Sequence, residues 1–137
     1  MAVDLGIENL TDIELIGRGG FSIVYAATDT RTGRRVAVKV IHAVSDRIHR
    51  SFERERAVMA RLSAHPNVVT LYDSGYTPDG RPYLSMELMD EGTLADRVGR
   101  QGPLPWRVAV NLLLPIAGAL DFAHRQQALH RDVQPQT

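Results

Sequence analysis

Short runs of apolar residues alternate with polar or small ones over the first forty positions, and this pattern predicts β-strands. The runs fall at residues 13–16, 23–27 and 36–41. Gly17-Arg18-Gly19-Gly20 separates the first two runs and the polar stretch 28–33 separates the last two, so both connections have the composition of turns. The pattern predicts three consecutive antiparallel strands.

A helical period replaces this alternation after residue 45. Residues 46–63 predict a helix whose apolar positions are Ile48, Phe52, Met59 and Leu62. Two further β-like runs, 68–76 and 82–87, follow and are joined by the turn residues 77–81. The first ninety residues therefore predict a five-stranded antiparallel sheet with one helix.

The remaining residues predict helices. Asp90-Glu91-Gly92 form a polar linker, 93–100 fit a short helix, and 106–127 fit a long apolar helix that Pro115 is expected to kink. We expect no membrane span there, because polar and helix-breaking residues leave no run of about 20 predominantly apolar residues. These residues are Arg107, Asn111, Pro115, Gly118 and Asp121. The predicted fold class is α+β, a sheet with one helix followed by further helices.

Composition and charge exclude several classes of protein. The 137-residue chain has 16 basic and 16 acidic side chains and no Cys. Its net charge therefore gives no overall attraction to nucleic acid or to an anionic membrane, and disulfides, Cys-ligated zinc and thiol catalysis are ruled out. Acidic residues within the first fourteen positions do not fit a signal peptide. We expect a soluble, cytoplasmic chain.

One cation differs from all the others. Fifteen of the 16 basic residues are Arg, and Lys39, directly after Val36-Ala37-Val38, is the single Lys. Its position in an apolar strand suggests a site that needs a compact ammonium group rather than a planar guanidinium. Lys39 is therefore the first candidate functional residue.

The turn between the first two strands is a candidate phosphate-binding flap. Gly17, Gly19 and Ser22 have the spacing G-x-G-x-x-S, and glycines at such a turn let backbone N–H groups approach phosphate oxygens. A β-like run follows the glycines where a dinucleotide fold needs a helix, and the Gly-Lys-Ser or Gly-Lys-Thr of a Walker loop is absent. An ordinary glycine-rich hairpin stays open as the alternative.

The helix after Lys39 carries a carboxylate on its apolar side. Glu55 fills the gap between Phe52 and Met59. A carboxylate on a buried face needs a cationic partner, and Lys39 on the neighbouring strand is the obvious candidate. Glu53 falls off this stripe and is expected to meet solvent. The alternative is that Glu55 lies at a solvated edge of the helix.

The third candidate is Leu129-His130-Arg131-Asp132, which follows the long apolar helix. A carboxylate just beyond a helix suits a general base. A solvated loop residue is the alternative interpretation of Asp132.

The order of these motifs along the chain resembles the protein kinase signature set, from about Ile13 to the last residue. The motifs are the flap, Val36-Ala37-Val38-Lys39, the helix with Glu55, and His130-Arg131-Asp132. Other stretches are similar to bacterial, actinobacterial-type, eukaryotic-like serine/threonine kinases. They are His65-Pro66-Asn67-Val68-Val69, Arg81-Pro82-Tyr83, Met86-Glu87-Leu88-Met89, Gly102-Pro103-Leu104 and Gly118-Ala119-Leu120. The resemblance implies a kinase-like small lobe at 1–87, a hinge at 88–92 and an incomplete helical large lobe at 93–137.

The resemblance also implies roles for the candidate residues. ATP with Mg²⁺ would bind beneath the flap, and Lys39 would hold the α- and β-phosphates while Glu55 orients it. Asp132 would accept the proton of a Ser or Thr hydroxyl of a protein substrate. The adenine slot would be formed by Ile16, Val24, Ala37 and Met86 and by the backbone of Glu87 and Met89.

Some positions depart from the family pattern. Ser22 replaces a third glycine, and Gln134 and Thr137 stand where the family has a phosphate-neutralising Lys and a magnesium-binding Asn. Because the 137 residues contain no Asp-Phe-Gly metal site and no activation segment, we expect little activity from this chain by itself.

The long helix 106–127 is expected to expose an apolar face through which the chain self-associates or binds a partner. This face comprises Val110, Leu113, Ile116, Ala117 and Leu120. The resemblance thus implies a serine/threonine protein kinase, with ATP and a protein as substrates and no nucleic-acid partner. Two other functions stay open: a catalytically dead nucleotide-binding or interaction module, and a degenerate gene product.

Overall fold

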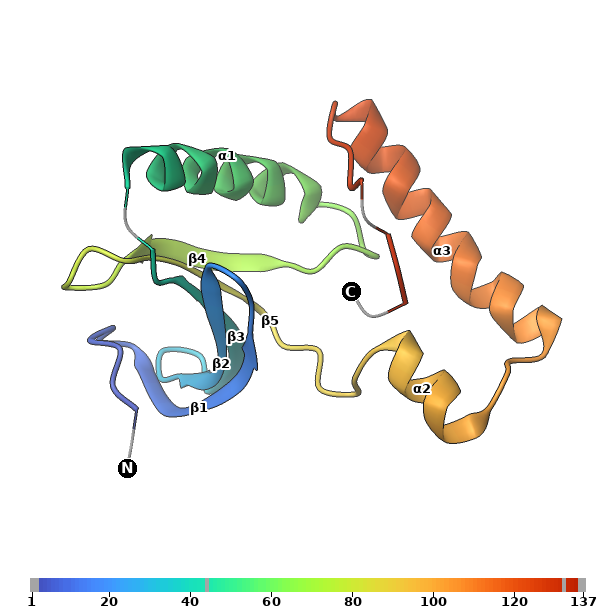
Figure 1. The fold of residues 1–137 in the computed structure, drawn as a ribbon, viewed down its shortest axis with the longest axis horizontal. Coiled ribbons are helices and arrows are strands. Elements are labelled where there is room, and N and C mark those ends of the chain that lie inside the picture. The colour runs from blue at the N-terminus through green and yellow to red at the C-terminus, as the bar shows by residue number, and fades with distance from the viewer. Residues whose placement is uncertain (1–2, 44, 132, 136–137) are drawn as a thin grey trace. The chain divides into compact units, whose positions relative to one another are not determined.

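The computed structural model describes residues 3–43, 45–131 and 133–135 of the chain. Its elements, in chain order, are β1 (Leu10–Arg18), β2 (Ser22–Asp29), β3 (Arg34–Ile41), α1 (Asp46–Leu62), β4 (Leu71–Tyr76), β5 (Pro82–Glu87), α2 (Leu94–Gln101) and α3 (Trp106–Arg125) (Figure 1). The predicted five strands, the helix that follows the third strand and the two later helices are confirmed.

The chain forms two compact units. One comprises the described parts of residues 1–60 and 69–88 and contains the sheet with most of α1. The other comprises those of residues 61–68 and 89–137 and contains α2 and α3. Lys39 and Glu55 both fall in the first unit.

The strands form one antiparallel sheet in the order β1-β2-β3-β5-β4, so β3 lies at its centre. Consecutive residues of a strand point to opposite faces, and directly paired residues share a face. Val24 pairs with Lys39 and Lys39 pairs with Leu84, while Ala37 pairs with Met86. These five side chains therefore lie on one face of the sheet.

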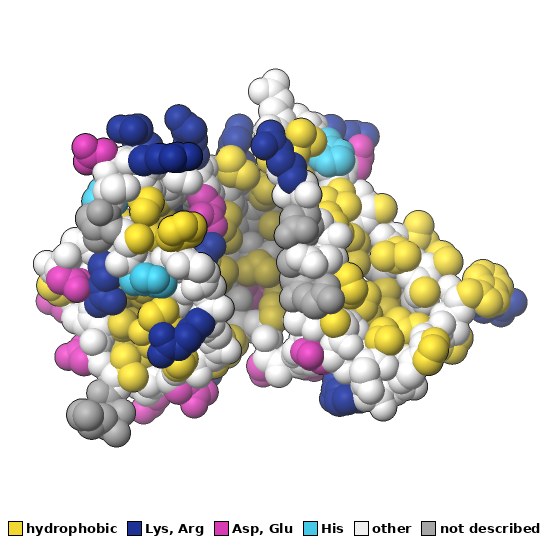
Figure 2. All heavy atoms as spheres, viewed as in Figure 1, with side chains coloured by type: hydrophobic (Ala, Val, Ile, Leu, Met, Phe, Trp, Pro, Cys, Tyr) yellow, Lys and Arg dark blue, Asp and Glu magenta, His cyan; other side chains and the backbone are white. Residues whose placement is uncertain are grey.

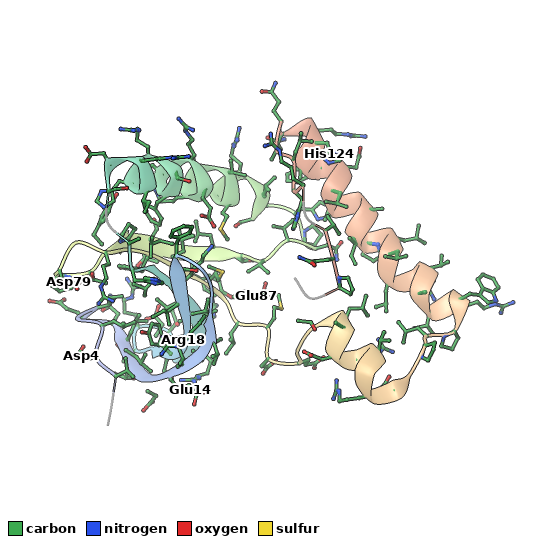
Figure 3. All side chains as sticks on the ribbon, viewed as in Figure 1. Asp4, Glu14, Arg18, Asp79, Glu87 and His124 are labelled. Carbon is green, nitrogen blue, oxygen red and sulfur yellow. The ribbon has the colours of Figure 1, made fainter. Side chains whose placement is uncertain are left out.

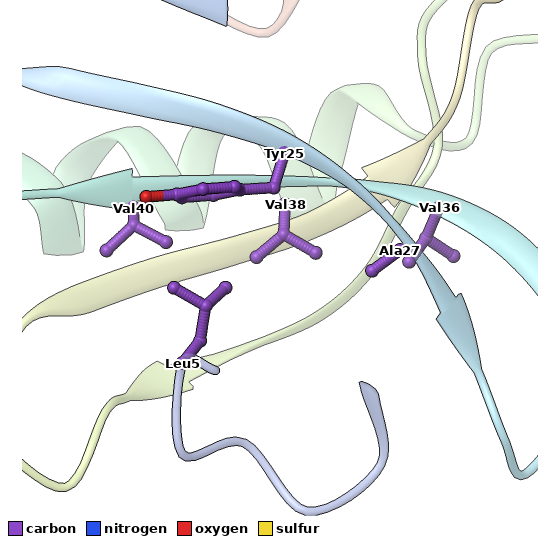
Figure 4. Packing of buried hydrophobic residues seen from close by; sticks show 6 residues of the cluster. All are labelled: Leu5, Tyr25, Ala27, Val36, Val38 and Val40. Atoms are coloured by element: carbon purple, nitrogen blue, oxygen red, sulfur yellow. The ribbon is translucent and has the colours of Figure 1, made fainter. Parts of the chain in front are cut away.

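The opposite face carries a cluster of buried apolar side chains. Val36, Val38 and Val40 of β3 are at most 1% exposed. They pack with Tyr25 of β2 and with Leu5 from the segment before β1 (Figure 4). The segment before β1 therefore covers this apolar face of β3.

α1 packs against the face of the sheet that carries Lys39 (Figure 1). Phe52 is 2% exposed and forms a second cluster with Ile41 and Leu84, against which Ile48 and Met59 pack. The predicted apolar stripe of this helix is thereby confirmed at Ile48, Phe52 and Met59.

In the second unit, α2 begins with a capping box. Thr93 Oγ1 accepts a hydrogen bond from the Asp96 N–H at 3.1 Å, and the Asp96 carboxylate accepts one from the Thr93 N–H at 2.8 Å. α3 continues through Pro115, whose missing N–H leaves one helical hydrogen bond unmade. The His65 and Phe122 rings lie 5.2 Å apart, which joins the segment after α1 to α3.

α3 exposes about half of its apolar side chains, and Figure 2 shows exposed apolar side chains in yellow. Leu113 and Leu114 are 54% and 64% exposed. The predicted apolar face is confirmed apart from Leu120, which is half-buried. Among the described residues, α3 is a helix long and apolar enough to cross a membrane by length and composition only, which is weak evidence of a span. The absence of a membrane span therefore stays a prediction from the sequence.

Candidate functional site

The flap joins β1 to β2. The Gly19 N–H donates a hydrogen bond to the Ser22 carbonyl at 2.7 Å, and Gly17 pairs with Val24 across the two strands. None of Gly17, Gly19 and Gly20 has a positive φ, so the turn itself does not require glycine. Their missing side chains instead leave room for another molecule to approach the backbone closely.

Lys39 and Glu55 form the pair that the sequence predicts. The Lys39 Nζ donates a hydrogen bond to Glu55 Oε1 at 3.0 Å. β3 places Lys39 on the face that α1 covers, and the helical spacing directs Glu55 to the same side as Phe52. The contact between strand and helix is confirmed.

The pair is less buried than the sequence predicts. The Lys39 and Glu55 side chains are 30% and 42% exposed, so both charges lie at the border of the apolar cluster rather than inside it. Partial contact with water lowers the cost of removing two charges from solvent. It also leaves the ammonium group accessible to a ligand.

A pocket of about 330 Å³ brings the flap and the charged pair together. It is lined by Gly20, Phe21, Ser22, Lys39, Ile41, Ile48, Ser51, Phe52 and Glu55. Sequence reasoning missed Phe21, which is 69% exposed. Its place as an aromatic residue between the flap glycines and β2 could have indicated that it lines the site.

The residues predicted for the adenine slot do not line this pocket. Val24, Ala37 and Met86 share the face of Lys39 through their strand pairing, whereas Ile16 lies at an irregularity of β1 and is 49% exposed. The structure therefore brings three of the four side chains onto the face of the charged pair.

Glu87 ends β5 and is labelled in Figure 3. Its N–H donates to the Thr70 carbonyl at 2.9 Å, and its carboxylate accepts a hydrogen bond from the Thr70 N–H at 3.4 Å. The Glu87 N–H is therefore not available to a base. Met89 belongs to the second unit and is 58% exposed.

Asp132 and Thr137 lie outside the described residues. The role of Asp132 as general base therefore stays a prediction from the sequence. The neighbouring Pro135 carbonyl accepts a hydrogen bond from the Ala95 N–H of α2 at 2.9 Å. This bond ties the described end of the chain to α2 within the second unit.

Glu53 meets solvent, as the sequence predicts, and also has two protein partners. The Tyr76 hydroxyl donates to Glu53 Oε1 at 2.8 Å, and Arg56 Nε donates to Glu53 Oε2 at 3.0 Å. The hydrogen bond from Arg56, and after it that from Tyr76, holds the pKa of Glu53 below its ordinary value. The Glu53 side chain is 43% exposed, so the expected contact with solvent is confirmed, and the two protein partners of its oxygens are what sequence reasoning missed.

Comparison with known proteins extends over nearly the whole chain. The protein kinase domain family matches residues 10–137. The chain is 41% identical over 134 residues to the serine/threonine-protein kinase PknK of Mycobacterium tuberculosis, covering 97% of this chain and 12% of PknK. It is also 41% identical over 128 residues to PknB of Mycolicibacterium smegmatis, covering 89% of this chain and 20% of PknB.

Solved structures agree with these relatives. The crystal structure of the Mycobacterium tuberculosis PknI kinase domain superposes with a TM-score of 0.77 at 31% identity, covering 99% of this chain and 58% of that one. The chain thus spans only part of the proteins it matches, and α3 lies within the matched region. The expected likeness to bacterial serine/threonine kinases is confirmed, and the chain belongs to the protein kinase domain family.

Proposed function

We propose that this chain binds ATP and forms part of the site that transfers its γ-phosphoryl group to a Ser or Thr hydroxyl of a protein. The observation that carries the proposal is the 3.0 Å hydrogen bond between Lys39 and Glu55 beside the flap. A cation already held in place can bind phosphate oxygens without reorganising. Phosphoryl transfer depends mostly on such positioning and charge stabilisation.

The roles follow the family pattern, and the contact between Lys39 and Glu55 supports them. Lys39 would bind the α- and β-phosphates, Glu55 would position Lys39, and the flap from Gly17 to Ser22 would cover the phosphates. Contacts to adenine would come from Ile16, Val24, Ala37, Met86 and the backbone of Glu87 and Met89. The engaged Glu87 N–H limits Glu87 to offering its carbonyl.

Asp132 would accept the proton of the substrate hydroxyl while the hydroxyl oxygen bonds to the γ-phosphorus, the bond from that phosphorus to the β,γ-bridging oxygen breaks, and ADP leaves. Mg²⁺ would accompany ATP and neutralise phosphate charge. The described residues contain no group of three or more His, Cys, Asp or Glu that could hold a metal ion, so we assign no ligand to Mg²⁺ and derive no step through it.

The proposal includes the division of the chain into a small lobe at 1–87, a hinge at 88–92 and part of the large lobe at 93–137. The end of β5 at Glu87 and the start of α2 at Leu94 support these limits. A cytoplasmic location stays a prediction from the sequence.

Phosphoryl transfer is tested by incubating the chain with γ-labelled ATP and Mg²⁺ and identifying the labelled amino acid. Because the 137 residues contain no Asp-Phe-Gly metal site, we expect only weak labelling, as phosphoserine or phosphothreonine, in the wild type and none in Lys39→Met. Arg54→Met is the matched control, because Arg54 is an exposed cation of α1 outside the pocket. Equal labelling of wild type and Lys39→Met would contradict the proposal.

A second candidate is a module that binds the nucleotide without transferring phosphate. Gln134, at the position where the family has a Lys, favours it because a neutral amide does not stabilise the charge of the transferring phosphate. This function predicts a rise in Tm with ATP that Lys39→Met abolishes, together with no labelled product.

A further inference from the structure

α1 is joined to the sheet by polar contacts at two strands. Glu55 accepts a hydrogen bond from Lys39 of the central strand β3, and Glu53 accepts one from Tyr76 of β4, which lies at the edge of the sheet. Residues two apart lie about 200° apart around a helix. The two carboxylates therefore leave α1 on opposite flanks of the face that buries Phe52.

Tyr76 is held at both its ring and its hydroxyl. Its ring centroid lies 5.9 Å from that of Phe52 and 5.5 Å from that of His49, and its hydroxyl lies 2.8 Å from Glu53 Oε1. Arg56 binds the other oxygen of this carboxylate. The carboxylate is therefore fixed by one residue of its own helix and one of the sheet.

The electrostatic effects of this contact agree with its geometry. The hydrogen bond to Glu53 raises the pKa of the Tyr76 hydroxyl. Arg56 and then Tyr76 lower the pKa of Glu53. Both directions are those of a protonated hydroxyl that donates to an ionised carboxylate.

A helix lying on a sheet can roll about its own axis while its central apolar side chain stays buried. A roll that lifts Glu55 away from β3 pushes Glu53 toward β4, and the opposite roll pulls Glu53 away from Tyr76. Contacts on both flanks therefore resist rolling in both directions, which neither contact achieves alone.

We propose that Glu53 and Tyr76 are positioning residues, which restrain the rotation of α1 and thereby keep Glu55 in contact with Lys39. For ATP binding, the inference rests on the function proposed above. For the orientation of α1, it rests only on the contacts between α1, β3 and β4.

Tyr76→Phe is the central variant, because it removes the hydroxyl and keeps the ring that packs against Phe52 and His49. Tyr72→Phe is its matched control on the same strand. The Tyr72 ring lies under the Arg34 guanidinium at 4.4 Å, a contact that Phe also makes. Both variants remove one hydroxyl oxygen from β4, and among the contacts of the described residues it is the Tyr76 hydroxyl that bonds to α1, through Glu53.

The orientation of α1 is measured by spin labels on Thr11→Cys in β1 and Arg54→Cys in α1. The chain has no other Cys, so labelling is specific, and both positions are exposed. We expect one narrow distance distribution in the labelled parent and in Tyr72→Phe. Tyr76→Phe should broaden it or add a second distance. An unchanged distribution in Tyr76→Phe would overturn the inference.

ATP binding provides the second measurement, by calorimetry on the unlabelled full chain. Tyr76→Phe should raise the Kd for ATP about threefold to tenfold and Tyr72→Phe should leave it unchanged. If the wild type does not bind ATP while Tyr76→Phe still broadens the distance distribution, the proposed function fails and the restraint on α1 stands.

If Tyr76→Phe lowers Tm enough to disturb the fold, Glu53→Gln replaces it as the test variant. It keeps the size of the side chain and removes the charge that Tyr76 and Arg56 bind. The double variant of Glu53 and Tyr76 should change the distribution no further than either single variant, since both act through one contact. If the two substitutions broadened the distance distribution additively, they would not act through one contact, and the inference would be overturned.

Discussion

Lys39 interrupts the buried alternation of β3. Val38 and Val40 beside it are 0% and 1% exposed, whereas the Lys39 side chain is 30% exposed. The sequence predicts its partner because the strand alternation and the helical stripe each fix one side of the contact. The hydrogen bond between Glu53 and Tyr76 cannot be predicted in this way, because it depends on where the edge strand β4 lies beneath α1.

Leu84 is a fully buried side chain whose truncation should lower stability. It is 0% exposed and packs with Phe52 and Ile41 between the sheet and α1. We expect Leu84→Ala to lower the free energy of unfolding by about 2–5 kcal/mol, because a cavity remains after the lost burial. Urea unfolding measures the change. Leu15→Ala, at a side chain 45% exposed, should cost about 0.5 kcal/mol or less, and equal losses would contradict the described packing.

At the scale of elements, most predicted boundaries lie within two residues of the observed ones, because turn residues and caps are local signals. β1 and β4 are the exceptions, since β1 begins at Leu10 rather than at residue 13 and β4 begins at Leu71 rather than at residue 68. The Val68 N–H donates to the His65 carbonyl at 3.1 Å, so this apolar residue closes a turn. An apolar run alone does not separate such a turn from the start of a strand.

The capping box of α2 predicts a dependence on pH. Hydrogen bonds from Thr93 hold the pKa of Asp96 below its ordinary value of 3.8. The stabilisation is therefore complete above the ordinary value and is lost as the pH falls through the lower pKa of the folded state. We expect the Thr93 amide resonance to titrate in that acidic range and the helicity of α2 to fall with it. Asp96→Asn should abolish this titration, and an amide that titrates unchanged in the variant would exclude the box as its cause.

At the scale of the whole molecule, the exposed apolar face of α3 predicts association. Leu113 and Leu114 are more than half exposed, and exposed apolar patches are common sites of protein contact. We expect light scattering after size-exclusion chromatography to give a mass above that of one chain, increasing with concentration. The double variant Leu113→Gln/Leu114→Gln should reduce it. A monodisperse monomer at all concentrations would refute self-association.

Family membership could be predicted from the sequence because it depends on the order of several motifs along the chain rather than on any one of them. The glycine flap alone fits a common hairpin, and Asp132 alone fits a loop. The sequence predicts that the flap, Lys39 and Glu55 lie together, but it does not predict that Phe21 and Ile41 also line the pocket, because that depends on three-dimensional packing. The structure supplies that packing by placing α1 over β3.

The central claim is that Lys39, positioned by Glu55, binds the phosphates of a nucleotide. Calorimetric titration of the full chain with ATP and Mg²⁺ tests it most directly. We predict saturable binding to one site in the wild type and in Arg54→Met, and a Kd raised about tenfold or more, equivalent to ~1.4 kcal/mol, in Lys39→Met. Absence of binding by a folded wild type, or equal affinity of wild type and Lys39→Met, would contradict the account.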